Sequence, residues 1–533
     1  DSRALDGELK RGQAMTSTKR VVRTAGIHVI FLLPPLISLI LSGPAAAQTV
    51  VRSFDGDQGM DLTTCNREVV RCTRQPEPNV AADGSRVVQV TVNNVNVYDY
   101  GGKLLRSTPF RQFVRDAGLD PNPAGNRDEP SKGPFEPHAV FDKFIGRWIV
   151  TVTCLNDCFV VSASADPLGP WHGVYLSCLQ GGPCLNFDPA LHIGYDKNGV
   201  YYCGGHAHDE HPQTVPGYAY DCFAIPSSEV KAIGDGREPE HVNRIHNLPL
   251  DILPAVDDNP HKGPRAPAFF AARTCSRAEP GGCQRSTNFS FQWIIDTFTW
   301  NGPTGTYNVG GEQMVGTDIG SKRNKWLYNL PCCTKQATMP QKGTGVGLRV
   351  AESHRLINLV QHGTHLHGAL GSGPCFAACG EQGADTNNLI VYVDFDCSNP
   401  TGCVVSQTAK IGGAEVNPVF GTVGVDQDGN VGITALSSTT NTDLSILLWT
   451  HRTTDAPNMF SGPTVLVAGT QPYMCVNADN MALIASAVGI LTVRDPVDGS
   501  KLWTTQQYGG NATPCVWDTK VIEYQIGSGW REK

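Results

Sequence analysis

The sequence has few charged residues, no heptad repeats and, after its first 45 positions, no apolar run long enough to cross a membrane. Asp, Glu, Lys and Arg make up 17% of the 533 residues, and the formal net charge is -8. No basic stripe is present, which argues against a nucleic-acid partner, and no acidic tail marks a disordered partner segment. Gly and Pro are plentiful, with 57 and 36 residues. This composition favours strands and turns over long helices.

The N-terminal region is expected to lie outside the fold. Met15 is the first methionine, and residues 1–14 read as translated upstream sequence. Three basic residues precede an apolar run over 27–41, and the small residues Ala45 to Ala47 follow it. This pattern predicts a signal peptide over 15–47, because a retained anchor would need about 20 apolar residues. We therefore expect a secreted protein, extracellular or periplasmic, with no membrane contact after cleavage, a lead-in at 48–78, the folded domain at 79–526 and a tail at 527–533.

All 18 cysteines follow the predicted signal peptide and fall mostly into close neighbours. The pairs are Cys65/Cys72, Cys154/Cys158, Cys178/Cys184, Cys203/Cys222, Cys275/Cys283, Cys375/Cys379, Cys397/Cys403 and, across a longer loop, Cys475/Cys515, which leaves the adjacent Cys332 and Cys333. In an exported chain this spacing predicts disulfides that pin local loops. Zinc is the alternative for Cys154/Cys158 and Cys375/Cys379, but neither has a second ligand pair at finger-like distance.

One unit recurs along the chain: an alternating apolar strand, an Asp, a few residues ending in Gly, and another strand. The Asp and Gly positions are Asp99/Gly102, Asp142/Gly146, Asp196/Gly199, Asp426/Gly429 and Asp495/Gly499. Asp accepts hydrogen bonds from its own backbone two residues on, and Gly supplies the positive φ of a tight hairpin. Two further units, over 267–307 and 348–405, keep strand, loop and strand without this turn.

The unit starts lie roughly 45–80 residues apart, a spacing typical of four-stranded propeller blades with loop insertions. The fold class expected is all-β, a β-propeller of six or seven blades with seven favoured, stapled by local disulfides. A long array of β-sandwiches is the competing fold. The ring is expected to close where strands at 502–507 and 516–525 meet strands near 87–105.

Several segments resemble a group of exported bacterial β-propeller proteins. They read VVQVTVNNVNVYDYGGKLL, PHAVFDKFIGRWIVT, VVSASADPLGPWHGVYL, VGVDQDGNVGITALSS and DPVDGSKLWTTQQYGG. The resemblance covers most of 79–524 and implies a propeller of the broad sialidase-like or glycosidase-like type, without a particular substrate. The relatives often read Trp-Gly-Asp-Tyr in the last blade, where this chain reads YMCVNADNMALIA. A site that depends on that tetrapeptide is not carried over.

Polar residues at or just before the inferred inner strands are candidates for ligand binding, because one residue per blade converges at the channel mouth. They are His138, His192, Arg265, His365 and Asn417. Water in the channel would equally account for polar side chains there.

Two histidine clusters suggest a metal site. The first holds His206, His208 and His211, and the second holds His362, His365 and His367. Imidazoles two apart on a strand point to one face and chelate divalent metals. The cofactor expectation is therefore either none or one divalent ion, with zinc, copper and calcium all open. A solvated insertion is the alternative for these histidines.

A carboxylate pair is the second route to chemistry. Glycosidases use two carboxyl groups with separated pKa values, and Glu415 and Glu210 are the candidates here. The leading hypothesis is a carbohydrate-active hydrolase that takes a small-molecule or polysaccharide ligand. A non-catalytic glycan-binding or adhesion module and a metal-dependent enzyme are the alternatives, and the sequence leaves the oligomeric state open.

Overall fold

The structure is a computed structural model that describes residues 48–59, 76–121, 135–154, 157–181, 187–207, 218–248, 252–275, 291–310, 312–314, 338–349, 356–372, 388–399, 402–413, 415–474, 481–483, 491–511, 513 and 516–527. All of these residues belong to one compact unit, Ala46–Lys533. No helix in this described part of the chain is long and apolar enough to span a membrane.

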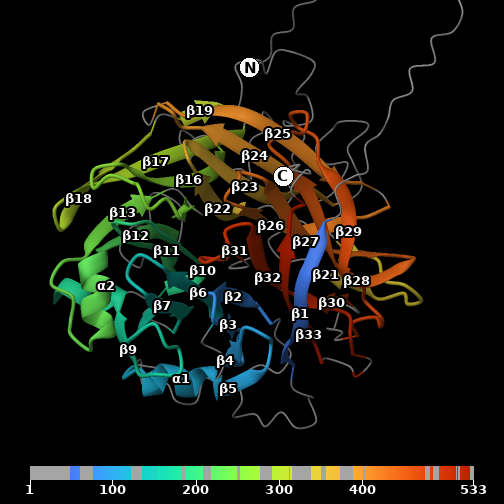
Figure 1. The fold of residues 1–533 in the computed structure, drawn as a ribbon, viewed down its shortest axis with the longest axis horizontal. Coiled ribbons are helices and arrows are strands. Elements are labelled where there is room, and N and C mark those ends of the chain that lie inside the picture. The colour runs from blue at the N-terminus through green and yellow to red at the C-terminus, as the bar shows by residue number, and fades with distance from the viewer. Residues whose placement is uncertain are drawn as a thin grey trace, which may run out of the picture. The chain divides into compact units, whose positions relative to one another are not determined.

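Seven sheets form the blades of a β-propeller (Figure 1). Blade 1 contains β2 (Asn79–Ala82), β3 (Arg86–Val90), β4 (Asn94–Asp99) and β5 (Leu104–Pro109). Blade 2 contains β6 (Phe135–Asp142), β7 (Arg147–Thr153), β8 (Cys158–Ser162) and β9 (Trp171–Tyr175). Blade 3 contains β10 (Phe187–Tyr195), β11 (Gly199–Ala207), β12 (Tyr218–Pro226) and β13 (Asn243–Leu248).

The next two blades include short extra strands. Blade 4 contains β14 (Leu253–Pro254), β16 (Ala268–Cys275), β17 (Phe291–Asn301) and β18 (Thr304–Asn308), with β19 (Glu312–Met314) also paired to β17. Blade 5 contains β22 (Leu356–His362), β23 (His365–Ser372), β24 (Leu389–Asp396) and β25 (Val404–Gly412). The short β15 (Val256–Asp257) pairs in parallel with β22.

The last two blades complete the ring. Blade 6 contains β26 (Pro418–Val425), β27 (Val431–Thr439), β28 (Thr442–His451) and β29 (Ser461–Val467). Blade 7 contains β31 (Thr492–Arg494), β32 (Lys501–Tyr508), β33 (Asp518–Gln525) and, as its outer strand, β1 (Thr49–Gln58). A small separate sheet contains β20 (Thr338–Met339), β21 (Gly347–Arg349) and β30 (Met481–Leu483). The predicted seven-bladed all-β fold is confirmed.

Helices are few and short. The α-helices are α1 (Phe110–Asp116) and α2 (Ser227–Gly234), and η1 (Leu176–Gly181) is a 3₁₀ helix. Phe113 and Val114 of α1 belong to the buried cluster shared by blades 1 and 2. Val230 and Ile233 of α2 belong to the cluster shared by blades 2 and 3. Similar buried apolar clusters lie between the other neighbouring blades, so the core is a ring of inter-blade contacts.

The innermost strands run in the same direction around the axis. Asn79 of β2 accepts a hydrogen bond from the Ala139 backbone N–H of β6 at 3.1 Å, and Asn358 of β22 bonds Val423 of β26. These contacts join innermost strands of neighbouring blades that lie side by side in the same direction, so all of them begin at one end of the ring and finish at the other. We call the end where the innermost strands begin the leading face, and the end where they finish the trailing face.

The Asp turns form as predicted, with one correction to the role of Gly. Oδ1 of Asp142, of Asp426 and of Asp495 each accepts a backbone N–H two residues on at 2.9 Å. Gly102, Gly146 and Gly429 have positive φ, whereas Gly199 and Gly499 do not. In blade 1 the equivalent turn is Asp83-Gly84, which the sequence reasoning missed, with Gly84 at φ 90°.

Three predicted disulfides are confirmed: Cys154–Cys158, Cys203–Cys222 and Cys397–Cys403. Zinc at Cys154/Cys158 is therefore wrong. Each other predicted pair includes at least one cysteine that lies outside the described residues. Disulfides of this kind indicate folding in an oxidising compartment.

The ring closes differently from the expectation. The C-terminal strands pack against blade 1, but their hydrogen-bonded partner is β1, which pairs with β33 from Thr49↔Gln525 to Gln58↔Asp518. The expectation placed closure at 87–105 because nothing local marks a strand whose partner lies more than 400 residues away. Closure by an N-terminal strand ties the two ends of the chain into one blade.

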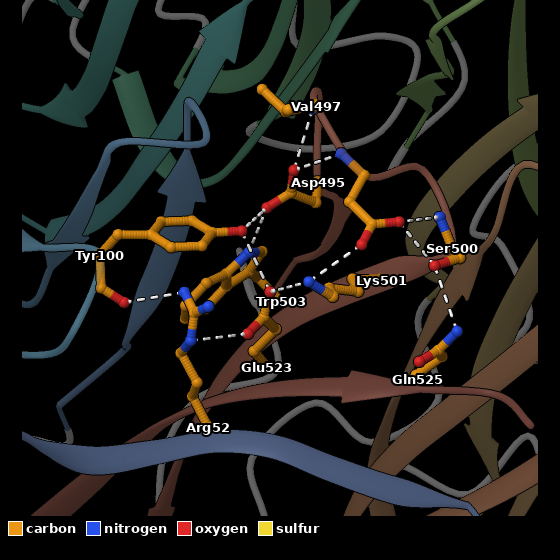
Figure 2. Close-up of polar contacts among 10 residues, drawn as sticks. Arg52, Tyr100, Asp495, Val497, Ser500, Lys501, Trp503, Glu523 and Gln525 are labelled. Carbon is orange, nitrogen blue, oxygen red and sulfur yellow. Dashed lines mark hydrogen bonds and ion pairs between the residues drawn. The ribbon is translucent and has the colours of Figure 1, made fainter.

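A polar network fixes this closure to blade 1 (Figure 2). Arg52 of β1 pairs with Glu523 of β33, with Nε and Oε2 3.3 Å apart, and its Nη1 donates to the Tyr100 carbonyl at 3.0 Å. The Tyr100 hydroxyl lies within hydrogen-bond distance of Asp495 and of Glu523. Trp503 Nε1 donates to Asp495 at 3.0 Å. Blades 7 and 1 are thus joined through two carboxylates that share one phenol.

Candidate functional site

β-Bulges interrupt the innermost strands near the leading face. The register shifts fall between Phe135 and His138 in β6, Asp188 and His192 in β10, and Val419 and Thr422 in β26. A further shift lies between Leu356 and Asn358 in β22. Bulges re-aim side chains and occur preferentially beside active sites. The leading face is therefore where this fold departs most from regular strands.

His138 and His192 each follow one of these bulges. Both side chains are buried, and their ring centroids are 6.4 Å apart. His138 Nδ1 lies 3.0 Å from the Glu136 carbonyl, and burial lowers the pKa of His138 to about 4. Its imidazole is therefore neutral at neutral pH, with Nδ1–H as the donor to that carbonyl. The structure brings together two of the predicted ligand-binding residues.

The interface between blades 2 and 3 is apolar toward the trailing face and polar toward the leading face. Val140, Ile149 and Val200 belong to its apolar cluster. Beyond them, Thr151 and Thr153 are buried, and neither hydroxyl has a hydrogen-bond partner among the described residues. Buried polar atoms normally form hydrogen bonds. A layer of buried hydroxyl groups without such partners is typical of a site that binds a polar ligand or water.

Asp157 is the most perturbed acid in this polar layer. It is fully buried at φ 51°, where β8 is about to begin, and its Oδ1 accepts a hydrogen bond from the Tyr202 hydroxyl at 3.1 Å. Its Oδ2 has no partner within the described ranges. Burial raises the pKa of Asp157 well above its usual value, because a desolvated carboxylate is less stable than the protonated acid.

Tyr202 connects Asp157 to a second carboxyl group. Burial, then the charge of Asp157, and then the charge of Glu136 raise the pKa of Tyr202 well above its ordinary value. Glu136 is buried at φ 49° within the β6 bulge, and its backbone N–H donates to Glu77 at 2.8 Å. Two carboxyl groups, those of Asp157 and Glu136, therefore both raise the pKa of the Tyr202 phenol at the leading face of blades 2 and 3.

An ion-pair cluster completes this interface on its outer side. Arg244 Nη2 of β13 lies 2.9 Å from Oδ2 of the buried Asp221 on β12, and His246 Nδ1 lies 2.9 Å from the same oxygen. The charge of Arg244 partly offsets the effect of burial on the pKa of Asp157. Sequence reasoning missed Asp157, Tyr202 and Asp221, since no motif marks them and only packing brings them together.

The remaining ligand-binding candidates are divided between the two faces. Asn417, before β26, is buried at the leading face with φ 50°. Arg265 lies in the exposed connection between β15 and β16, and His365 begins β23, so both stand at the trailing face. Arg265 was expected before an innermost strand because the predicted unit started at 267 and left out β14. His365 was expected at an inner strand, whereas the structure places it on β23, the strand after β22.

The carboxylate candidates are placed only in part. Glu415 is exposed in the connection between β25 and β26 at the leading face. Glu210 lies outside the described residues, as do His208 and His211. His206 belongs to β11, where its backbone pairs with Phe187 and Ala219.

The second histidine cluster is held by other side chains. His365 Nδ1 lies 2.9 Å from Asp394 Oδ1, and His367 Nδ1 lies 2.8 Å from the Tyr392 hydroxyl. His362 ends β22, where burial lowers its pKa. Within the described ranges no group of three or more His, Cys, Asp or Glu side chains is arranged to hold a metal ion. The metal expectation therefore has no support from these residues.

The trailing face carries a separate ion cluster centred on Asp258. Asp258 Oδ1 accepts a hydrogen bond from the Tyr195 hydroxyl at 2.8 Å and lies 3.4 Å from Lys143 Nζ. Its Oδ2 lies 3.2 Å from Arg494 Nη2. All four residues stand within one position of the end of an inner strand, in four different blades. Their charges satisfy one another, which is typical of a structural cluster.

Fold and site together define the class as a seven-bladed β-propeller with a polar site at its leading face. No known family model and no curated protein matches the sequence. Solved structures match at low identity. A sialidase from Trypanosoma rangeli in complex with the inhibitor DANA is 8% identical with a TM-score of 0.32, and the match covers 72% of this chain and 54% of that one.

Two other structures are similar over more of their length. Hydrazine synthase from Kuenenia stuttgartiensis is 9% identical with a TM-score of 0.39, covering 81% and 93% of the two chains. A polysaccharide lyase described as an ulvan lyase is 10% identical with a TM-score of 0.39, covering 84% and 91%. The present chain spans about half of the sialidase chain. At these identities and TM-scores the likeness carries no conclusion about the activity of this chain, and unrelated activities share one fold.

Proposed function

We propose that this chain is a secreted carbohydrate-active hydrolase that binds a glycan at the leading face of blades 2 and 3. The observation that carries the proposal is the carboxyl pair about Tyr202. Burial raises the pKa of Asp157, which favours its protonated form, and the charge of Glu136 raises the pKa of the same phenol. Glycosidic bond cleavage uses two carboxyl groups, of which the one with the raised pKa serves as the acid.

The direction of the Asp157 pKa shift suggests a role for each carboxyl group. Asp157 donates a proton to the glycosidic oxygen as that bond breaks, and Glu136 acts as base or nucleophile at the anomeric carbon. Water supplies the atoms that complete hydrolysis. The neutral imidazole of His138 and the open hydroxyl groups of Thr151 and Thr153 suit sugar hydroxyls, which are uncharged and both donate and accept hydrogen bonds.

The test uses residues 48–533, exported through an oxidising compartment and screened for reducing ends released from neutral polysaccharides. Asp157→Asn and Glu136→Gln are each expected to lower kcat/KM by about 100-fold or more. The matched control is Asp166→Asn, in the same blade, where an Asn side chain still accepts the hydrogen bond from the Leu168 backbone N–H. Full turnover by both site variants, with the control equally active, would overturn the assignment.

A non-catalytic glycan-binding or adhesion module is the second candidate, favoured by the complete burial of Asp157. Retention of the protein on a polysaccharide without product release would support it. Glu415 and Glu210 stay predictions, and Gln variants of each belong in the same screen. A metal-dependent enzyme would lose activity on chelation, and elemental analysis tests the histidine clusters directly.

A further inference from the structure

A buried amide at the leading face of blades 5 and 6 has both of its polar atoms open. Asn388, which precedes β24, is 1% exposed. Neither its Nδ2 nor its Oδ1 has a hydrogen-bond partner in the described part of the chain. An unpaired buried amide lowers folding stability, so its presence needs a reason other than the fold.

The backbone beside Asn388 is strained. The side-chain Oδ1 of Asn417 accepts the Asn388 backbone N–H at 2.9 Å, and Asn417 itself has φ 50°. Phe420, inside the β26 bulge, has φ 55°. Positive φ is unfavourable for a bulky residue and concentrates where ligands bind. Asn417 thus fixes the Asn388 backbone while the Asn388 amide stays open.

A second buried amide between the same blades shows the contrast. Asn358 Nδ2 donates to the Val423 carbonyl at 2.6 Å, and its Oδ1 accepts the Val423 backbone N–H at 2.9 Å. Asn358 therefore joins β22 to β26 with both amide atoms. Asn388 is equally buried and joins nothing through its side chain within the described ranges.

We infer that Asn388 is the binding residue of a second sugar subsite between blades 5 and 6. An open amide offers one donor and one acceptor side by side, which matches two vicinal hydroxyl groups or an acetamido group of a sugar residue. Glu415, two residues from Asn417 along the chain, is exposed at the same face. The subsite rests on the proposed glycan function and extends it: polar sites on two separate blade pairs of one face select an oligosaccharide over a single sugar.

The test compares Asn388→Ala with Asn358→Ala, using the melting temperature and calorimetric affinity for neutral tetrasaccharides of glucose, xylose, mannose and galactose. Asn388→Ala is expected to keep or raise the melting temperature, because it removes an unpaired amide, and to weaken tetrasaccharide binding at least about tenfold. Asn358→Ala is expected to lower the melting temperature and to leave the affinity of the folded protein unchanged.

Each result decides the matter. A melting temperature lowered by Asn388→Ala as much as by Asn358→Ala would make Asn388 a structural residue and overturn the inference. Unchanged tetrasaccharide affinity of Asn388→Ala would mean that its amide holds buried water only. If the wild-type chain binds no tetrasaccharide, both the proposed function and the sugar subsite are wrong. If the wild-type chain binds a tetrasaccharide and Asn388→Ala binds it equally well, only the subsite is wrong.

Discussion

Arg494 of blade 7 pairs with Asp258, which directly follows β15 in the sheet of blade 5, with Nη2 and Oδ2 3.2 Å apart. These blades are not neighbours in the ring, so their ion pair spans the axis at the trailing face. Leu491, just before β31, belongs to the apolar cluster of blades 2 and 3 and makes a second cross-axis contact. Contacts between distant blades thus tie the trailing end of the axis together.

The first prediction concerns this cross-axis pair. Asp258→Asn removes the charge that faces Lys143 and Arg494, both largely buried, and is expected to lower the free energy of unfolding by about 1–3 kcal/mol. Urea denaturation measures it. The control is Asp235→Asn, because the Asp235 side chain that pairs with Arg147 and Arg237 is 44% exposed against 11% for Asp258, and the expected loss is about 0.5 kcal/mol or less. Equal losses of unfolding free energy in the two variants would show that the cross-axis ion pair of Asp258 does not stabilise the propeller.

The second prediction concerns the polar network that joins blades 7 and 1 in Figure 2. Tyr100→Phe removes the hydroxyl group that lies between Asp495 and Glu523, and Glu523 is fully buried. Two carboxyl groups would then lose a shared partner, with an expected loss of about 1–3 kcal/mol in the free energy of unfolding. Tyr175→Phe, which loses hydrogen bonds to the exposed Asp120 backbone, is the control. A loss no larger than that of the control would show that the Tyr100 hydroxyl group does not stabilise the contact between blades 7 and 1.

The third prediction compares two disulfides. Cys203–Cys222 joins β11 to β12 across 19 positions, and Cys397–Cys403 closes a separation of 6. Loop-closure entropy gives about 3 kcal/mol for the first and about 2 kcal/mol for the second. Paired Cys→Ala variants should therefore differ in denaturation midpoint, with the Cys203/Cys222 variant less stable. The reverse order would mean that packing around the sulfur atoms outweighs chain entropy.

The fourth prediction concerns Asp142, in the turn after β6. Burial raises the pKa of Asp142 to about 7 from its model-peptide value of 3.8, and its Oδ2 has no partner among the described residues. A raised carboxyl pKa gives stability that is full below pH 3.8 and is lost as the pH rises through 7. Asp142→Asn should therefore stabilise the protein at pH 8 by on the order of 1–3 kcal/mol and change little at pH 4. Denaturation at the two pH values checks this, and a stabilisation of equal size at both would contradict it.

The sequence predicts what depends on neighbours along the chain. Asp142, Asp196 and Asp426 form their turns because the bonded atoms are two residues apart. His138 and His192 each precede a turn Asp by four positions, so both occupy the same level of adjacent inner strands. Both were predicted as ligand-binding residues because they stand at or just before inferred inner strands.

What depends on distant packing was not predicted. β14 and β15 are two residues each, and β14 contains Pro254. Both are too short to show the alternation of apolar and polar residues that marks a strand. Without β14, Arg265 was assigned to the wrong end of its blade. Asp157 and Asn388 stand in sequence without a motif, and only burial between blades makes them unusual.

The last prediction concerns acid stability. Burial lowers the pKa of His138 and of His367 to about 4, against 6.5 for an unburied imidazole. The unfolded chain binds a proton at each position near pH 6.5, while the folded chain resists until about pH 4, so each histidine destabilises the fold as the pH falls through this window.

His138→Asn keeps a donor for the Glu136 carbonyl and cannot take up that proton. The variant should lose less stability than the wild type between pH 6.5 and 4, by on the order of 2–3 kcal/mol. His261→Asn, at an exposed loop position, is the control and should follow the wild type. Parallel pH curves for His138→Asn and wild type would mean that His138 is protonated in the folded protein, and the neutral lining proposed for the glycan site would then be wrong.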